Sequence, residues 1–324
     1  MTHALGRTLL IANPAAQNGN GKQAARYAEE KLRGSIPESD FVLKLTEAPR
    51  HGFELAATSA SFDTVVALGG DGVIHEIANG LMSLPEAQRP QFGVLPVGSG
   101  NDYAKTLGVS FTLEESVEQL TKSQSRLFDV GCCNGEYFVE TLSFGLDAAI
   151  ALDTVKRRVE TGKRGARLFF ESGIDMLLHN LHTYDYVMRL DGVGSADTAA
   201  IAAAEVDVEE AAEHRGQMML FAVQVGKTYG GGFTICPKAS TDDGLFDLCI
   251  AHPPMGVPKA VMIFILAKDA HHTKFKQLEF LTTSALNLRF EGKIPPVQID
   301  GEAFAGESFD IACIPHALRV LVPS

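Results

Sequence analysis

The chain has 324 residues, of which 45% are hydrophobic and 21% are charged. This composition excludes a disordered or low-complexity chain, and the 31 glycines follow no fixed period, which excludes a collagen-like repeat. The 28 Lys and Arg residues against 40 Asp and Glu residues give a formal net charge of −12, the wrong sign for a protein that binds nucleic-acid backbone. We therefore expect a globular protein, long enough for two domains, with no nucleic acid among its partners.

The sequence contains no candidate signal peptide or membrane span. The apolar residues before Asn13 are too few for a signal-peptide core, and the apolar run 260–267 is far shorter than the roughly 20 residues of a membrane helix. The five cysteines show no Cys-x-x-Cys spacing and lie mostly in apolar stretches, as free thiols of a reducing compartment do. We expect a cytoplasmic protein without a transmembrane segment, and association with a membrane surface remains open.

Short apolar strands alternate with helical patterns in the first 126 residues. Strands are predicted at 9–12, 41–45, 64–68 and 92–95, and helices include 23–32 and 74–82. This alternation is typical of a parallel sheet with crossover helices, so the fold class of the first part is α/β.

The pattern changes after residue 126. Seven strands are predicted with few helices between them: 127–132, 137–142, 184–190, 218–225, 246–251, 285–290 and 309–314. We expect a β-rich, antiparallel, sandwich-like second domain. Its helices lie within 148–181 and at 258–270, and the first region contains the basic segment Lys156–Arg167, either a charged helix face or a contact for anionic lipid headgroups. The Ala- and Glu-rich stretch 196–213 is predicted to be an exposed insertion or loop.

Two glycine-rich loops each follow a predicted strand and open a helix. In the first, Gly69-Gly70-Asp71-Gly72, backbone N–H groups could bind a phosphate at the helix N-terminus, and Asp71 beside phosphates indicates Mg²⁺ or a proton acceptor. The second, Gly98-Ser99-Gly100-Asn101-Asp102, offers a hydroxyl and helix-capping side chains. A structural turn and a cap are the alternative interpretations, but two such loops would meet at the carboxyl edge of a parallel sheet, where ligands bind.

Two acidic loops lie far along the chain. These are Asp242-Asp243-Gly244 and Asp300-Gly301-Glu302, and Asp-Gly between apolar runs is also the ordinary signal of a β-hairpin.

Together these motifs resemble the diacylglycerol kinase catalytic-domain family, most of all its bacterial lipid kinases. The resemblance covers nearly the whole chain. It rests on seven motifs in order: Asn13-Pro14, Gly69–Gly72, Pro96–Asp102, Phe144–Ala148, Gly230–Phe233, Asp243-Gly244 and Asp300–Glu302. It implies an ATP- and Mg²⁺-dependent lipid kinase, with diacylglycerol the default acceptor and phosphatidic acid the product. It also implies a nucleotide-binding domain over 1–126, rejoined by a strand at 315–324, and a lipid-binding and catalytic domain over 127–314.

The resemblance also implies roles for particular residues. Glu302 matches a proposed general base, and Asp71, Asp102 and Asp129 match an acidic network around Mg²⁺ and phosphate. Ser240, Asp243 and Leu245 match a structural Mg²⁺ site. Contacts with ATP are implied for Asn13, Thr46, Gly70, Asp71, Gly72, Val73, Glu76, Ser99 and Asn101. The lipid substrate would be met at a membrane surface, on the inner face of the membrane, and a homodimer is compatible with these expectations.

This chain departs from the family at two positions. Val73 stands where Thr is usual, which removes one hydroxyl, and His75 stands where Asn is common, which either alters nucleotide orientation or is a neutral surface change. Two alternatives stay open: a soluble-substrate kinase related to NAD kinases, and a lipid-binding pseudokinase without turnover. His179 and His182 share one helix face but have no third ligand in register, which argues against a metal site, and His271 and His272 are interpreted as surface residues.

Overall fold

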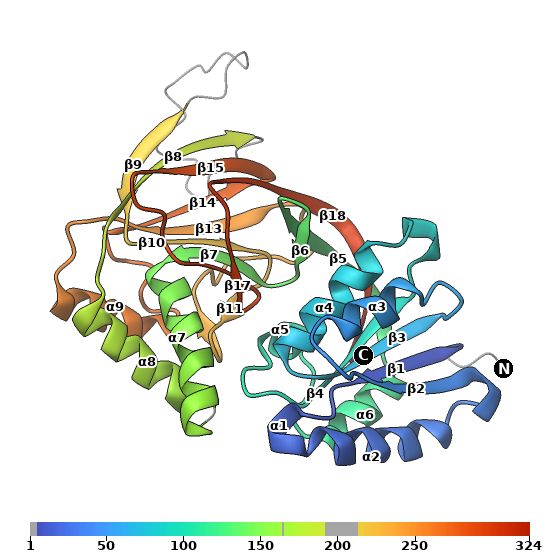
Figure 1. The fold of residues 1–324 in the computed structure, drawn as a ribbon. Helices are drawn as coiled ribbons and strands as arrows, with labels where there is room; N and C mark the ends of the chain where they lie inside the picture. Colours follow the sequence, from blue (N-terminus) through green and yellow to red (C-terminus); the bar gives the residue numbers. More distant parts are fainter. Residues whose placement is uncertain (1–4, 164, 192–212) are drawn as a thin grey trace. The chain divides into compact units, whose positions relative to one another are not determined.

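The structure, a computed structural model, describes residues 5–163, 165–191 and 213–324. These residues form two compact units (Figure 1). The first comprises residues up to 130 together with 137–139 and 316–324, and the second comprises 131–136 and 140–315. The chain therefore passes between the units several times.

The first unit is built on a parallel sheet. Its strand order is β2-β1-β3-β4, with the last part of β18 paired in parallel to β4 through Val320 and Phe92. Strands β1 and β3 are buried along their whole length, as expected of apolar strands covered on both faces. The strands are β1 (Thr8–Ala12), β2 (Phe41–Leu45), β3 (Thr64–Gly69), β4 (Gln91–Pro96), β5 (Gln124–Cys133), β6 (Glu136–Phe138) and β18 (Ser308–Val322).

Helices connect these strands as the α/β prediction requires. On α2, Ala25, Ala28 and Leu32 recur at a helical period, and all three pack into one apolar core with Leu10 of β1. The helices are α1 (Ala16–Gly19), α2 (Gly21–Arg33), α3 (His51–Ala57), α4 (Asp71–Met82), α5 (Asp102–Thr106) and α6 (Leu113–Thr121). The predicted parallel sheet with crossover helices is confirmed.

Among the described residues, the second unit contains two larger antiparallel sheets and the two-stranded sheet β11–β12. The six-stranded sheet has the order β14-β13-β10-β7-β16-β17, and the other runs from the first part of β18 through β15 and β8 to β9. The strands not yet introduced are β7 (Thr141–Gly145), β8 (Tyr184–Asp191), β9 (His214–Met218), β10 (Leu220–Gln224), β11 (Thr228–Tyr229), β12 (Phe233–Thr234), β13 (Phe246–Ala251), β14 (Leu278–Thr283), β15 (Ala285–Glu291), β16 (Val297–Ile299) and β17 (Glu302–Phe304).

An aromatic core joins the two sheets of this unit. The ring of Phe144 on β7 lies 6.1 Å from that of Phe221 on β10, and 5.4 and 4.8 Å from those of Phe290 and Phe309 on the other sheet. Phe144, Phe221 and Phe309 are fully buried. Edge-to-face packing between inward-facing rings is how a sandwich fills the space between its sheets, and the predicted β-rich antiparallel domain is confirmed.

Three helices cover the other face of the six-stranded sheet: α7 (Leu146–Thr161), α8 (Ala166–His179) and α9 (Val257–Ala267) (Figure 1). Phe170 and Leu178 on α8, and Met262 and Ile265 on α9, remain exposed. Helix α9 is apolar around most of its circumference. Among the residues that the structure describes, no helix combines the length and apolarity that crossing a bilayer requires.

Some predicted strands have different bounds. The stretch 137–142 is divided between β6 and β7. The stretch 218–225 is divided between β9 and β10 at Met219, whose amide donates to Ala251 O. Strand β14 lies in a stretch, 278–283, where the sequence predicted no strand.

The basic segment of α7 and α8 is largely neutralised within the unit. Arg157 bonds to Asp153 and Asp175, while Lys163 and Arg167 both bond to Glu171. Arg164 lies outside the described residues. These local ion pairs favour the charged-helix-face interpretation over an anionic-lipid contact. The predicted insertion 196–213 also falls outside the described residues, except Glu213, whose carboxylate accepts bonds from three arginines: Arg189, Arg215 and Arg289.

Candidate active site

Four of the predicted ATP contacts follow strands β1 to β4 of the parallel sheet in the first unit. Asn13 comes directly after β1, Thr46 after β2, Gly70 after β3 and Ser99 after β4. The Asn13 amide donates to Leu68 O, and that of Thr46 to Ala12 O, so each continues the hydrogen bonding of its strand. Since the strands are parallel, these residues share the carboxyl edge of one sheet, the usual place for a ligand in an α/β domain.

The carboxylate of Asp71 joins the two glycine-rich loops. Its Oδ2 accepts the backbone N–H of Asn101 at 3.0 Å, and its Oδ1 accepts that of Asp102 at 3.1 Å. The backbones meet as well, because a Cβ on Gly98 would lie 2.5 Å from the Cα of Gly70. We call residues 70–73 and 98–102 the paired loops.

The second of the paired loops is held in an unusual conformation. Asn101 has a left-handed backbone with φ of 55°, and its Oδ1 accepts the amide of Gly98 at 2.8 Å. The side chain of Asn101 is therefore engaged in shaping the loop. Asn is among the residues that adopt this conformation at least cost. Ser99, which lies between Gly98 and Asn101 in the chain, is half-buried.

The first of the paired loops opens helix α4, whose first-turn N–H groups have no acceptor within the helix. Gly70 caps the helix, with Asp71 and Gly72 following it. Val73 is buried, and its Cγ1 occupies the space beside Gly69 where a Cβ would lie, at 2.3 Å. The side chain of Val73 thus packs into the fold, and only its backbone is available to a phosphate.

Two further residues of α4 have structural contacts. Both carboxylate oxygens of Glu76 accept backbone N–H groups, from Arg50 at 2.8 Å and from Gly52 at 3.0 Å, which fixes the start of α3. His75 is buried beside Asn79, whose side chain bonds to both backbone groups of Tyr137. The surface interpretation of His75 is therefore wrong, and a contact between Glu76 and ATP stays a prediction.

Asp129, the third member of the predicted acidic network, lies on β5. It is 2% exposed, and its Oδ1 accepts the backbone N–H of His316 at 2.8 Å. His316 has a positive φ of 53°, so Asp129 stabilises a bend in β18. A hydrogen bond joins Asp71 to the backbone of Asp102, whereas the bond of Asp129 is to His316.

The predicted base, Glu302, is in the second unit. It begins β17 and is exposed, directly after the two-residue turn Asp300-Gly301 that closes the β16–β17 hairpin. The turn is firmly held: Asp300 is buried and its Oδ1 accepts the amides of Glu140 and Thr141, both at 3.0 Å. The hairpin interpretation is correct, and the hairpin presents Glu302 at a fixed place on an exposed edge.

The predicted structural Mg²⁺ site is a loop before β13. Ser240 Oγ donates to Asp242 at 2.7 Å, and Asp243 Oδ1 accepts the amide of Leu245 at 3.1 Å. Burial raises the pKa of Asp247 to about 6, and the charge of Asp243 adds to this. The carboxylates of Asp243, in this loop, and Asp247, on β13, repel each other, and such a pair fits a hard dication. No group of three or more His, Cys, Asp or Glu side chains with metal-binding geometry occurs among the described residues.

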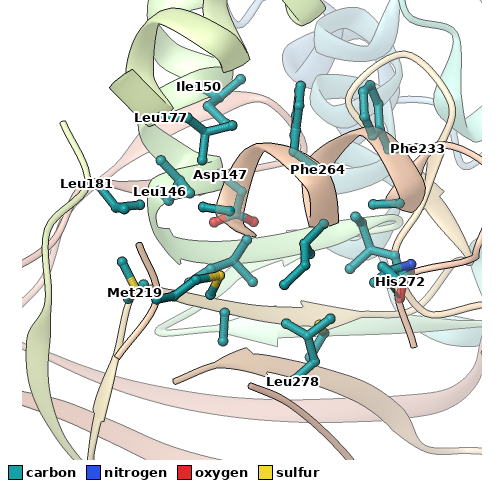
Figure 2. Close-up of a pocket in the computed structure, with 18 of the residues that line it drawn as sticks. Leu146, Asp147, Ile150, Leu177, Leu181, Met219, Phe233, Phe264, His272 and Leu278 are labelled. Carbon is teal, nitrogen blue, oxygen red and sulfur yellow. Dashed lines mark hydrogen bonds between the residues drawn. The ribbon is translucent and has the colours of Figure 1, made fainter. Parts of the chain in front are cut away.

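The second unit also contains a cavity that the sequence analysis did not predict. It has a volume of about 80 Å³ and lies between helices α7, α8 and α9 and the six-stranded sheet, with apolar side chains such as Leu177, Ile263 and Phe264 in its walls (Figure 2). Two buried polar side chains also line it, Asp147 and His272. The prediction that His272 lies on the surface is wrong, since it is 2% exposed, whereas His271 is exposed as predicted.

Two family models match the chain in sequence. The diacylglycerol kinase catalytic domain matches residues 7–133, and the YegS C-terminal NAD kinase beta sandwich-like domain matches residues 140–322. The chain belongs to the diacylglycerol kinase catalytic-domain family. Within this family its second unit is of the YegS type, and the expected resemblance is confirmed.

Individual relatives agree with this membership. Proteins named "Probable lipid kinase YegS-like" from Yersinia pestis (strain Pestoides F) and Yersinia pseudotuberculosis serotype O:1b are each 29% identical over 310 residues, covering 94% of this chain and 95% of the relative. A solved structure described as a diacylglycerol kinase from Bacillus anthracis str. Sterne has a TM-score of 0.77 at 20% identity, and 99% of this chain and 98% of that chain are covered. The family fold thus extends over the whole length of the chain.

Proposed function

We propose that the chain is an ATP- and Mg²⁺-dependent lipid kinase that transfers the γ-phosphate of ATP to a lipid hydroxyl. Diacylglycerol, which would give phosphatidic acid, is the first acceptor to test. The observation that carries the proposal is the bonding of Asp71 to the amides of Asn101 and Asp102, because it holds the paired loops together at the carboxyl edge of the sheet. Membership of the family supports the same reaction class.

The paired loops would position the nucleotide. The backbone N–H groups of Gly72 and Val73, at the positive end of α4, would donate to phosphate oxygens, and the Ser99 hydroxyl would donate from the facing loop. Mg²⁺, when bound, would neutralise phosphate charge, and the carboxylates of Asp71 and Asp102 would offer it the hard oxygen ligands it prefers, whereas a part for Asp129 stays a prediction. Catalysis would come mainly from this positioning and from charge neutralisation.

Glu302 would serve as the general base. Its exposed carboxylate takes the proton of the acceptor hydroxyl, and the hydroxyl oxygen bonds to the γ-phosphorus as the bond between that phosphorus and the leaving oxygen of ADP breaks. The loop with Ser240, Asp243 and Leu245 would hold a second, structural Mg²⁺ in the same unit. Exposed apolar side chains on α8 and α9 support action at a membrane surface, which we propose to be the cytoplasmic face.

A transfer assay with radiolabelled ATP tests the function. The acceptors are diacylglycerol, phosphatidylglycerol, a sphingoid base and ceramide in mixed micelles, with NAD as the soluble acceptor. Labelled lipid that depends on Mg²⁺ is the expected result. Label in NAD alone would favour a kinase related to NAD kinases, and no label in any acceptor, despite ATP binding, would favour a pseudokinase; either result would overturn the proposal.

A further inference from the structure

Strand β14 ends the six-stranded sheet with an edge that lacks the usual protection. It pairs with β13 on one side and with no other strand that the structure describes. At six residues it is longer than β2, β9 and β17, the other strands at the ends of the two larger sheets. Its one charged side chain is Glu279, whereas β2 contains Lys44 and β9 contains Arg215. Short edge strands and cationic side chains discourage pairing with other chains, and β14 has neither.

The register shows which backbone groups of β14 point away from β13. The amide of His252 donates to Gln277 O at 2.8 Å, so Gln277 bonds toward the β13 side. Because bonding alternates along an antiparallel pair, Glu279 and Leu281 also bond toward β13, and the N–H and C=O of Phe280 point outward. Neither group of Phe280 has a hydrogen-bond partner among the described residues. The middle of β14 therefore offers one donor and one acceptor at an open edge.

A second copy of β14 complements this edge. Two antiparallel copies related by a twofold axis at Phe280 bring the N–H of each Phe280 opposite the C=O of the other, which forms a reciprocal pair of hydrogen bonds. The same register puts Glu279 opposite Leu281 of the second copy, so no like charges face each other directly. The two Glu279 side chains are diagonal neighbours, and each is bonded to His252 Nε2 of its own copy at 2.7 Å, which offsets its charge.

Pairing of β14 with itself also closes the assembly. An isologous contact uses the same edge on both copies, so neither copy keeps an open β14. Pairing of β14 with a different end strand, such as β9, would leave one free edge on each copy and would propagate into a filament. A closed pair is the arrangement that covers this edge and stops there.

We propose that the protein forms a twofold-symmetric dimer in which β14 of one copy pairs antiparallel with β14 of a second copy about Phe280. The two six-stranded sheets then form one continuous sheet. This inference does not depend on the proposed kinase reaction.

Sedimentation equilibrium of the purified chain measures the dimer. A single pair of edge strands is a small interface, so the dissociation constant should lie within a concentration range of about 1 to 100 µM. Hydrogen exchange of peptides that contain Phe280 should slow as the concentration rises through the same range, because the outward amide becomes bonded.

Two substitutions of Phe280 separate the backbone edge from the side chain. Phe280→Pro and Phe280→Leu both remove the ring, but only proline removes the outward N–H, and an edge strand tolerates proline where the N–H faces away from the sheet. The reciprocal bonds are lost together, so the dissociation constant of Phe280→Pro should be at least about tenfold higher than that of Phe280→Leu.

Two substitutions of Leu281 test the register. Opposite Glu279 of the second copy, Leu281→Glu should raise the dissociation constant about three- to tenfold, whereas Leu281→Lys should leave it unchanged or lower it. Both variants introduce a charge at the same half-buried position, so a loss of folding would affect them alike. This pair also decides the test if Phe280→Pro fails to fold.

A chain that stays monomeric at about 100 µM would overturn the proposal. A dimer with the same dissociation constant in Phe280→Pro and Phe280→Leu would overturn it as well, because the outward N–H would then take no part. Equal effects of Leu281→Glu and Leu281→Lys would exclude the pairing of position 281 with Glu279 and with it the twofold axis at Phe280.

Discussion

The buried carboxyl of Asp147 makes stability depend on pH in a calculable way. Burial raises its pKa from 3.8 to about 6, and the hydrogen bond from Tyr229 offsets part of the effect. Since one pKa unit is worth about 1.4 kcal/mol, keeping this group ionised in the folded chain costs about 3 kcal/mol. The unfolded chain loses the proton near pH 4 and the folded chain near pH 6, so the cost is absent below pH 4 and complete above pH 6.

Replacing Asp147 with Asn removes the ionisation and keeps the shape. The free energy of unfolding of Asp147→Asn should equal that of the wild type at pH 4 and exceed it by up to about 3 kcal/mol at pH 7.5. Asp247, whose pKa is also raised to about 6, is present in both proteins and cancels in the comparison.

Urea unfolding followed by far-ultraviolet circular dichroism measures this difference, because the chain has no Trp for fluorescence. Hydrogen exchange of peptides from β7 and β10 assigns the change to the second unit. Tyr229→Phe is the opposite control: without its hydrogen bond the pKa of Asp147 rises further, and the loss of stability between pH 4 and pH 7.5 becomes larger than in the wild type. A difference between Asp147→Asn and wild type that does not change with pH would refute the reasoning.

Three other predictions concern the proposed kinase site. Glu302→Gln should reduce turnover by about 10²- to 10⁴-fold with unchanged ATP affinity, while Glu307→Gln, exposed on the connection after the same hairpin, should not; equal initial rates for both variants would contradict the base assignment. Asp71→Asn leaves one acceptor oxygen for the amides of Asn101 and Asp102, so the thermal midpoint should fall and ATP should bind roughly tenfold more weakly in a titration. A wild-type midpoint and affinity in this variant would show that the paired loops do not need the carboxylate. Added Mg²⁺ should raise the thermal midpoint of the wild type but not that of Asp243→Asn. A wild-type midpoint that does not change with Mg²⁺ would refute the structural Mg²⁺ site.

Local pattern was enough to predict the fold class. Continuous apolar runs such as 64–68, bounded by turn residues, become buried parallel strands, and the periodicity of 74–82 becomes α4. Strand β14 was missed because Lys276 and Gln277 directly precede it and Glu279 interrupts its apolar residues, and its pairing with β13 is a tertiary effect. The break between β9 and β10 likewise depends on a bond to Ala251 and leaves no local signal.

For the candidate site, sequence indicated the residues but not their contacts. Asp71 was expected beside phosphates, yet its bonds to Asn101 and Asp102 join positions about 30 apart and depend on the sheet order. The sequence did not indicate that Asp147 is hydrogen-bonded, because its partner Tyr229 is 82 positions away. Burial of His272 could not be predicted either, since its neighbours His271 and Thr273 are exposed.

Strand β18 belongs to the second unit up to Pro315 and to the first unit from His316, and this affects how the protein folds during synthesis. Its residues Leu318, Val320 and Leu321 are buried in the first unit, where β18 pairs with β4, yet they are synthesised after the whole second unit. A nascent chain that has just completed β5 therefore has an unpaired edge at β4, and such edges invite association with other strands. Expression of residues 1–130 alone should give an aggregating fragment, and supplying 308–324 as a separate peptide should restore its solubility.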